Sequence, residues 1–286
     1  MSISTLTVRD SPYTAIFEGI EPAVDRLYVT GDNLEDLLSR PRVAIVGSRK
    51  ISAYGKTITA QFAAELARQG IVIVSGLAYG VDATAHRATL EAGGLTIAVL
   101  PSSIQEIYPA AHRGLAEQIA QSGGALLSEY EPDTPTMKHN FIGRNRIVSG
   151  MSDVLLITEA AINSGTMHTA RFALEQGKDV LAIPGNITSL TSAGTNNLIK
   201  SGATPVTCPQ DVLHALGINT TVSIPKVKGS NTIEQTILNL MEENIADANE
   251  LLIRSELSTD QFNQALVMME ITGKIRAVGA NQWTIR

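Results

Sequence analysis

The chain has 286 residues, 44% of them hydrophobic, and a formal charge of −6 at pH 7. This length predicts one large domain and a small one, and the acidic balance argues against a protein that coats nucleic acid through a general basic surplus. One cysteine excludes an internal disulfide framework and favours a reducing compartment. Residues Met1–Asp10 lack the apolar core of a signal peptide, and no apolar run is long enough to span a bilayer. We therefore expect a soluble, cytoplasmic protein.

The first forty residues show no strong hydrophobic period. Leu27–Val29 predicts a short strand, and Asn33–Leu38 predicts a helical turn. We interpret residues 1–40 as a lead-in segment that packs on the core and is not a domain of its own.

Residues 41–219 alternate short apolar runs with amphipathic segments. The apolar runs predict strands at Arg42–Val46, Ile71–Val74, Thr96–Leu100, Ala125–Leu127, Val154–Ile157, Val180–Ile183 and Thr204–Val206. The amphipathic segments predict helices around Ile58–Leu66 and at Asp82–Ala92, Pro109–Gln121, Thr166–Gln176 and Gly194–Ser201. Strands separated by such helices need parallel crossovers of one hand. The pattern therefore predicts an open, mostly parallel sheet with helices on both faces.

Small-residue turns follow four of these strands: Gly47-Ser48, Ser75-Gly76, Ser164-Gly165 and Pro184-Gly185. In an open parallel sheet the carboxyl ends of the strands share one edge, and ligands bind outside that edge. Turn chemistry alone is the alternative explanation for any one of the turns. Four turns on one edge favour a ligand site there.

A basic and aromatic cluster precedes the fifth strand of the predicted core. It has no acidic residue and contains Lys138, His139, Phe141, Arg144 and Arg146. The strand that follows leads through a small-residue turn into a helix, and a helix start offers N–H groups and a positive dipole end to an anion. Cations, a stacking ring and a phosphate cradle in one segment indicate single-stranded nucleic acid as the ligand.

The roles of individual residues have alternatives. Arg49 is expected to contact a phosphate, the alternative being an ion pair with an acid such as Glu159. Lys138 is a second candidate phosphate contact or a solvated lysine, and Phe141 either stacks on a base or belongs to the core.

Arg144 and Arg146 divide between two roles, because one should face the pocket while the other pairs with Glu129 or Glu159. His86 and His168 are expected to be structural, because no further metal ligands stand at suitable spacing. We expect no metal and no cofactor.

Known nucleotide sites fit this sequence poorly. Arg49 stands where a dinucleotide-binding G-x-G-x-x-G motif needs its second glycine, and no Walker A loop is present. A nucleotide-binding sensor or a phosphoribohydrolase-like enzyme on the same fold remains the alternative function. Enzymes of that kind carry a catalytic glutamate after a glycine-rich loop, where this chain has His168 and Thr169.

The C-terminal part reads as a polar linker, residues 220–231, followed by a winged-helix pattern over residues 232–286. Capping-box spacing begins at Thr232 and at Ser258, and two strands are expected at Lys274–Ala277 and Gln282–Ile285. The predicted recognition helix has no lysine or arginine. We therefore expect this domain to contact protein and not DNA.

Several motifs together resemble the DNA-processing protein A family (DprA, or Smf). They are Val43–Arg49 with Ser52, Tyr54 and Gly55, Ser75–Asp82 with His86, Ser128–Tyr130, Asn140–Arg146, Glu159-Ala160, Ser164–Thr166, Thr169-Ala170, Pro184-Gly185 and Gly194–Ile199. The resemblance implies an extended Rossmann-like fold and no catalytic activity. It also implies single-stranded DNA binding in natural transformation, homodimerisation, and loading of a RecA-type recombinase.

Motif positions and residue chemistry together define one predicted DNA site. Its residues are Gly47, Ser48, Arg49, Lys138, Asn140, Phe141, Arg144, Arg146, Ser164, Gly165 and Thr166.

Overall fold

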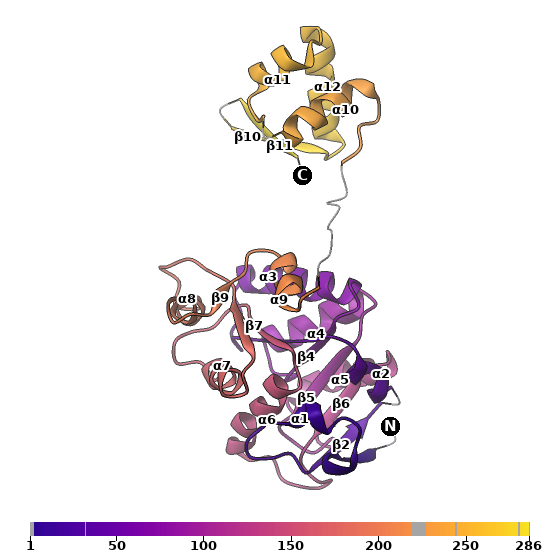
Figure 1. The fold of residues 1–286 in the computed structure, drawn as a ribbon, viewed down its shortest axis with the longest axis vertical. Coiled ribbons are helices and arrows are strands. Elements are labelled where there is room, and N and C mark those ends of the chain that lie inside the picture. Colours follow the sequence, from indigo (N-terminus) through magenta and orange to yellow (C-terminus); the bar gives the residue numbers. More distant parts are fainter. Residues whose placement is uncertain (1–2, 32, 219–226, 244, 280, 286) are drawn as a thin grey trace. The chain divides into compact units, whose positions relative to one another are not determined.

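The computed structural model of the protein describes residues 3–31, 33–218, 227–243, 245–279 and 281–285. The chain divides into two compact units, Met1–Thr220 and Thr221–Arg286. Of the predicted linker, residues 220–226 lie outside the described part of the chain. Figure 1 shows the helices and strands of each unit.

The first unit is built on a large sheet. Its strands are β1 (Ser4–Thr7), β2 (Arg26–Thr30), β3 (Arg42–Val46), β4 (Val72–Ser75), β5 (Thr96–Leu100), β6 (Ala125–Ser128), β7 (Val154–Ile157), β8 (Asp179–Ala182) and β9 (Thr204–Pro205). Their order in space is β1-β2-β6-β5-β4-β3-β7-β8-β9. The strands from β3 to β9 pair in parallel, for example Val43 with Val154 and Val46 with Ile157. The predicted doubly wound, mostly parallel sheet is confirmed.

The lead-in segment supplies the antiparallel edge of this sheet. β2 pairs with β6, and β1 pairs with β2. The segment also contains α1 (Thr14–Phe17) and α2 (Leu34–Ser39). Ile20 approaches Gly150 so closely that a Cβ at position 150 would lie 2.3 Å from an Ile20 carbon. Residues 1–40 thus extend the sheet as well as packing on it.

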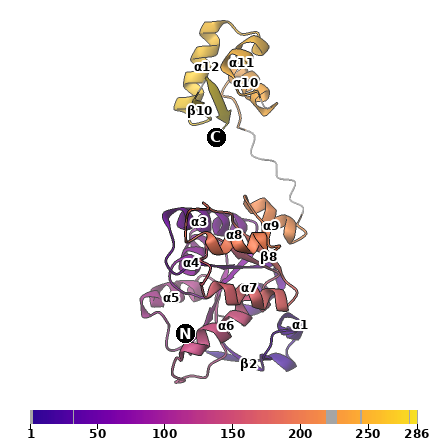
Figure 2. The ribbon, with the colours of Figure 1, turned by 90° about the vertical axis from the view of Figure 1, so that its left-hand side faces the viewer.

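Helices cover both faces of the sheet because successive strand residues point to opposite sides. Leu155 and Ile157 pack with α6, α7 and α8, whereas Val154 and Leu156 pack with α3, α4 and α9. The helix bounds are α3 (Ala53–Arg68), α4 (Val81–Glu91), α5 (Arg113–Gln121), α6 (Lys138–Gly150), α7 (Thr166–Glu175), α8 (Ala193–Lys200) and α9 (Pro209–Ala215). Turning the molecule by 90° brings the layer with α7 and α8 forward (Figure 2).

Helix α6 was not expected from the sequence, although the basic cluster lies on it. Its buried face carries polar residues, among them Asn140, Arg144 and Ser149, beside Ile147 and Val148. The hydrophobic period that marks most surface helices is therefore weak here. Packing against the sheet, and not local propensity, forms this helix.

The second unit contains three helices and a hairpin, as expected of a winged helix. They are α10 (Thr232–Glu242), α11 (Ala248–Ser255), α12 (Thr259–Ile271), β10 (Ile275–Gly279) and β11 (Gln282–Ile285). The capping box at Ser258 and Gln261 is present, but the first helix is capped by Asn231, one residue before the expected Thr232. The side chain of Asn231 accepts a hydrogen bond from the Glu234 N–H at 2.8 Å.

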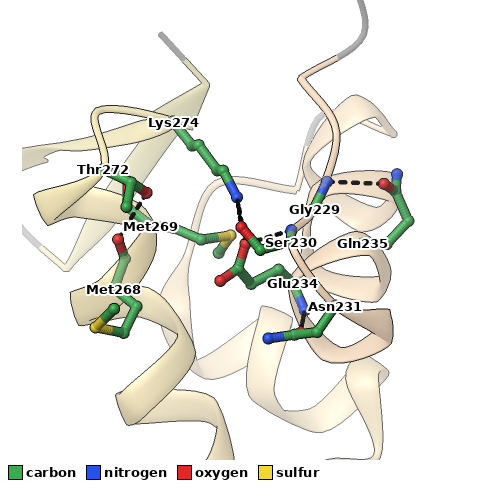
Figure 3. Close-up of polar contacts among 9 residues, drawn as sticks. All are labelled: Gly229, Ser230, Asn231, Glu234, Gln235, Met268, Met269, Thr272 and Lys274. Carbon is green, nitrogen blue, oxygen red and sulfur yellow. Dashed lines mark hydrogen bonds and ion pairs between the residues drawn. The ribbon is translucent and has the colours of Figure 1, made fainter.

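The end of the predicted linker is tied to this unit. Glu234 accepts hydrogen bonds from the Ser230 N–H and from Lys274, and Gln235 accepts one from the Gly229 N–H at 2.9 Å (Figure 3). Val227 packs against the apolar core of the unit. These contacts attach residues 227–231 to the winged helix.

Candidate nucleic-acid interface

A cavity of about 560 Å³ opens at the edge where the strands from β3 to β8 end. It lies where the strand order reverses, since β4 and β7 leave β3 on opposite sides. Open α/β sheets bind ligands at such a switch point. The lining residues include Gly47, Ser48, Arg49, Lys50, Gly76, Asp82, Phe141, Arg144, Asn145, Asn163, Ser164, Gly165, Thr166 and Thr191.

The turn after β3 is fixed by its neighbours on both sides. The Ser48 N–H donates to the Glu159 carbonyl at 2.7 Å, and the Ser48 carbonyl accepts from the Val81 N–H at 3.1 Å. Gly80, with φ of 78°, lets the next loop approach so closely that a Cβ there would lie 2.1 Å from the Ser48 oxygen. This packing holds the backbone of Arg49 at the cavity and leaves its side chain exposed.

Arg49 lies over an aromatic ring and forms no ion pair with a carboxylate among the described residues. Its guanidinium carbon is 5.2 Å from the centroid of Phe141, within the range of a cation–π contact. The edge of Tyr108 meets the same ring, with centroids 5.0 Å apart. In the described part of the chain Arg49 has no carboxylate partner, and Glu159 instead accepts from Ser52 and Thr191. The ion pair considered for Arg49 is therefore not formed.

Phe141 is half-buried in the cavity wall, so it belongs to the site as well as to the packing of α6. Lys138 is exposed and does not line the cavity. It precedes Phe141 by three positions on α6, which places the two Cβ atoms about 5–6 Å apart on one helix surface. Lys138 thus lies near Phe141 on α6 but outside the cavity.

Arg144 forms the buried floor of the cavity. Its guanidinium donates to the carbonyls of Gly76 and Val99, and only 4% of the residue is exposed. Burial lowers the pKa of Arg144 to about 10, an effect opposed by nearby Asp82. Burial also raises the pKa of Asp82, whose carboxylate accepts from the N–H groups of Gly76 and Ala78. Because its pKa stays well above 7, Arg144 is charged at neutral pH and adds positive potential at the buried side of the cavity.

Arg146 and Asn140 do not reach the cavity. Arg146 is 4% exposed and forms an ion pair with Glu129 at 2.7 Å, while Asn140 is 2% exposed. Of the two arginines, Arg144 faces the cavity and Arg146 pairs structurally. These positions give no geometric support to DNA contacts by Arg146 or Asn140.

The turn into α7 presents polar backbone to the same cavity. The Thr166 N–H donates to the Ser164 hydroxyl at 3.2 Å, so it is already used within the turn. The N–H groups of Gly165 and Arg49 make no hydrogen bond within the described part of the chain. Both residues line the cavity, so these two N–H groups are available to bind an anion.

Several lining or contacting residues lie outside the predicted DNA site, among them Asp82, Asn145 and the three that follow. Lys50 and Thr191 line the cavity, and Tyr108 contacts Phe141. Lys50 follows Arg49 directly and could have been included. Tyr108 lies in the loop after the third predicted strand. Because ligands bind at the carboxyl ends of the strands, the sequence indicated this loop, but it did not indicate that the Tyr108 ring contacts Phe141.

Of the two histidines that were expected to be structural, only His86 lies in the buried core. His86 is fully buried, and its Nδ1 lies 2.7 Å from the Thr96 hydroxyl. Burial lowers its pKa to about 3, with nearby Arg144 acting in the same direction. His168 is exposed. Among the described residues no group of three or more His, Cys, Asp or Glu side chains could hold a metal ion, and no helix is long and apolar enough to cross a membrane.

Comparison with known families gives two matches. Residues 4–217 match the model of DNA recombination-mediator protein A, and residues 225–281 match that of the DprA winged helix domain. Among curated proteins, Protein Smf of Escherichia coli is 38% identical over 83% of this chain and 66% of its own length. The DprA of Streptococcus pneumoniae is 43% identical over 62% of each chain. The chain spans about two thirds of the length of several curated relatives.

Two solved structures resemble the first unit. The DprA of Streptococcus pneumoniae has a TM-score of 0.69 at 38% identity, covering 75% of this chain and 74% of that one. The DNA processing protein A of Helicobacter pylori, described with a unique single-stranded DNA binding mode, has a TM-score of 0.68 at 37% identity, covering 76% and 96%. Fold, motif order and both family models agree, and the chain belongs to the DNA recombination-mediator protein A (DprA/Smf) family.

Proposed function

We propose that this chain binds single-stranded DNA in the switch-point cavity, without catalysis and without a cofactor. One observation carries the proposal: the guanidinium of Arg49 lies over the ring of Phe141 beside a cavity whose other cations include Lys50 and Arg144. A phosphate can bind the cations and free N–H groups while its base stacks on an aromatic ring. The Helicobacter pylori relative is described with a single-stranded DNA binding mode, which supports single-stranded DNA as the ligand.

The local charge explains how an acidic protein can bind a polyanion. Three cationic side chains line the cavity and one acid, Asp82, lies among them within the described residues. The carboxylate of Asp82 already accepts two backbone hydrogen bonds. Binding should therefore depend on a few phosphates, and the slope of log K against log salt should lie near 0.7 per neutralised phosphate.

A titration by fluorescence anisotropy tests this proposal. A labelled oligothymidine should bind strongly, and the matching duplex should bind weakly because its bases are not free to stack. Arg49→Glu and Lys138→Glu should weaken binding for every sequence. Arg68→Glu is the matched control, because Arg68 ends α3, about 24 Å along the helix from its first turn. Wild-type affinity in both Arg49→Glu and Lys138→Glu would place the DNA elsewhere.

The enzymatic alternative has a separate test. Asp82 is the acid that lines the cavity among the described residues, and its two backbone hydrogen bonds leave it poorly placed to stabilise a developing sugar cation. Incubation with nucleoside monophosphates should release no free base. Base release that disappears in Asp82→Asn would identify a phosphoribohydrolase-like enzyme instead.

We further propose that the chain acts as a homodimer that protects incoming strands and loads a RecA-type recombinase in natural transformation. Membership of the family supports this role, and the acidic winged helix suits a protein contact. Recombinase filaments should form faster on strands bound by the wild-type protein than on strands mixed with Arg49→Glu. Equal rates of filament formation would show that DNA binding by this protein does not promote loading of the recombinase.

A further inference from the structure

A second cavity, of about 480 Å³, lies beside the first at the same edge of the sheet. The start of α3 and the loop after β8 enclose it. Its lining residues are Ser52, Tyr54, Glu159, Pro184, Gly185, Asn186, Ser189 and Ser192. The DNA site described above gives this cavity no role.

The two cavities share one wall. Glu159 is 1% exposed and lines the second cavity, and it accepts a hydrogen bond from Thr191, which lines the first, at 2.7 Å. The Ser52 hydroxyl and N–H donate to the same carboxylate at 2.6 and 2.8 Å. A ligand that leaves the first cavity past Thr191 therefore meets the second directly.

The second cavity suits a base and not a phosphate. No lysine or arginine lines it, and its buried wall carries the carboxylate of Glu159. Tyr54 is 48% exposed, and its hydroxyl donates to the Pro184 carbonyl at 3.0 Å, which fixes the orientation of the ring. A fixed, exposed ring offers a stacking face at little entropic cost.

The loop after β8 adds polar and apolar contacts. The side-chain Oδ1 of Asn186 accepts hydrogen bonds from the N–H and hydroxyl of Thr188, while its side-chain NH₂ has no partner within the described residues. Ile187 and Leu190 are 92% and 84% exposed on the same loop. A donor for a base acceptor thus lies beside apolar side chains that a base or sugar could cover.

We propose that this cavity is a second base-binding subsite, which receives a nucleotide further along the strand held in the first cavity. Tyr54 stacks on that base, and Asn186 donates to one of its acceptors. The inference rests on the proposed function, since the first cavity must hold the same strand.

A ladder of oligothymidines from about two to about twelve nucleotides, which spans typical single-stranded site sizes, tests the subsite. Each competes with a labelled strand for the full chain, either wild type, Tyr54→Ala or Asn186→Ala. The shortest strands fill the first cavity alone, so the variants should match wild type there. Beyond a threshold length, Tyr54→Ala should bind about tenfold more weakly. Tyr54→Phe keeps the ring and should stay within about threefold of wild type at every length.

The outcomes separate the two proposals. Equal binding by wild type and both variants at all lengths, while Arg49→Glu still loses affinity, would overturn the subsite and leave the first cavity intact. A loss at every length would also overturn it, because Tyr54 would then act through the fold. Loss of the Arg49 effect as well would remove the proposed function itself. Binding of free thymidine monophosphate that depends on Tyr54, without any length dependence, would assign the cavity to a separate nucleotide.

Cross-linking locates the strand independently of affinity. A 5-iodouracil placed at successive positions of a long strand should cross-link to Phe141 from one position and to Tyr54 from another. Adducts on Phe141 from every reactive position, with none on Tyr54, would contradict the subsite.

Discussion

Both units have folds that bind nucleic acids in other proteins. The cations expected of a DNA-binding surface line the cavity of the α/β unit and are absent from the recognition helix of the winged helix. The winged helix often binds DNA through its third helix, yet α12 has no lysine or arginine and exposes Val267, Met268 and Ile271. Two of the unit's cations, Arg254 and Lys274, form ion pairs with Glu250 and Glu234.

In the α/β unit, by contrast, Arg49 and Lys50 line a cavity and form no ion pair within the described residues. An unpaired cation can bind a phosphate directly, whereas a cation in an ion pair must first break that pair. Ligand preference therefore follows from the residues at the site and not from the fold alone.

The largest effect is expected from a backbone clash beneath Arg49. In Gly80→Ala the new Cβ would meet the Ser48 oxygen at 2.1 Å, and φ at this position is 78°. The α/β unit should lose about 3 kcal/mol or more of unfolding free energy. Trp283, the single tryptophan, reports the winged helix alone, so its fluorescence transition should not move while the main circular dichroism transition does.

Gly93→Ala is the matched control for that variant. Gly93 has φ of 73°, but no atom lies within 4 Å of a Cβ built there. Gly93→Ala should lower the unfolding free energy only by the cost of placing an alanine at positive φ, about 1 kcal/mol. Equal losses in the two variants would show that the close approach at Gly80 does not matter.

Charge reversal compares the two units directly. Arg49→Glu should lower the affinity for single-stranded DNA about 100-fold, or about 2.7 kcal/mol, because it removes a phosphate contact and adds repulsion. Arg276→Glu, at an exposed position of β10 in the winged helix, should change affinity less than about twofold. Anisotropy titrations at one salt concentration measure both, and a comparable loss in Arg276→Glu would bring the winged helix into DNA binding.

Acid should destabilise the α/β unit through His86. Its folded-state pKa of about 3 lies below the unfolded value of roughly 6.5, so the unfolded chain binds the proton first. This stabilising contribution is complete above pH 6.5 and is lost as pH falls toward 3. The loss at pH 5 is about 2 kcal/mol.

The measurement compares unfolding free energies at pH 7 and pH 5. His86→Gln should lack this part of the pH dependence, whereas His139→Gln, which changes an exposed histidine, should keep it. The winged-helix segment contains no histidine, so the Trp283 transition should show no such step. An unchanged pH dependence in His86→Gln would assign the acid response to other groups.

The smallest effect is expected from the stacking ring. Phe141→Ala should weaken binding about tenfold, or about 1.4 kcal/mol, because it removes a base platform. Phe172 is the matched control, since Arg171 lies over its ring at 5.6 Å on α7 in the same unit. Phe172→Ala should leave affinity unchanged, and a loss equal to that of Phe141→Ala would show that the Phe141 effect does not come from a base stacked in the cavity.

Much of the core was predictable because its signals are local. Thr96–Leu100 and Val154–Ile157 form strands with the predicted bounds, since a buried parallel strand is a short continuous apolar run. The turns after the strands were also placed correctly, because glycine and serine mark the ends of apolar runs. Non-local pairings, such as β2 beside β6 and β1 beside β2, were not predictable from such signals.

The amino-acid sequence by itself determined which residues were available at the carboxyl edge: Arg49 after one strand, and Lys138, Phe141 and two arginines before another. Only the tertiary structure decided their directions. Arg144 and Arg146 are two positions apart on α6, so their side chains point about 200° apart around the helix. Packing of α6 on the sheet turned Arg144 toward the cavity and Arg146 toward Glu129, and no local rule fixes that rotation.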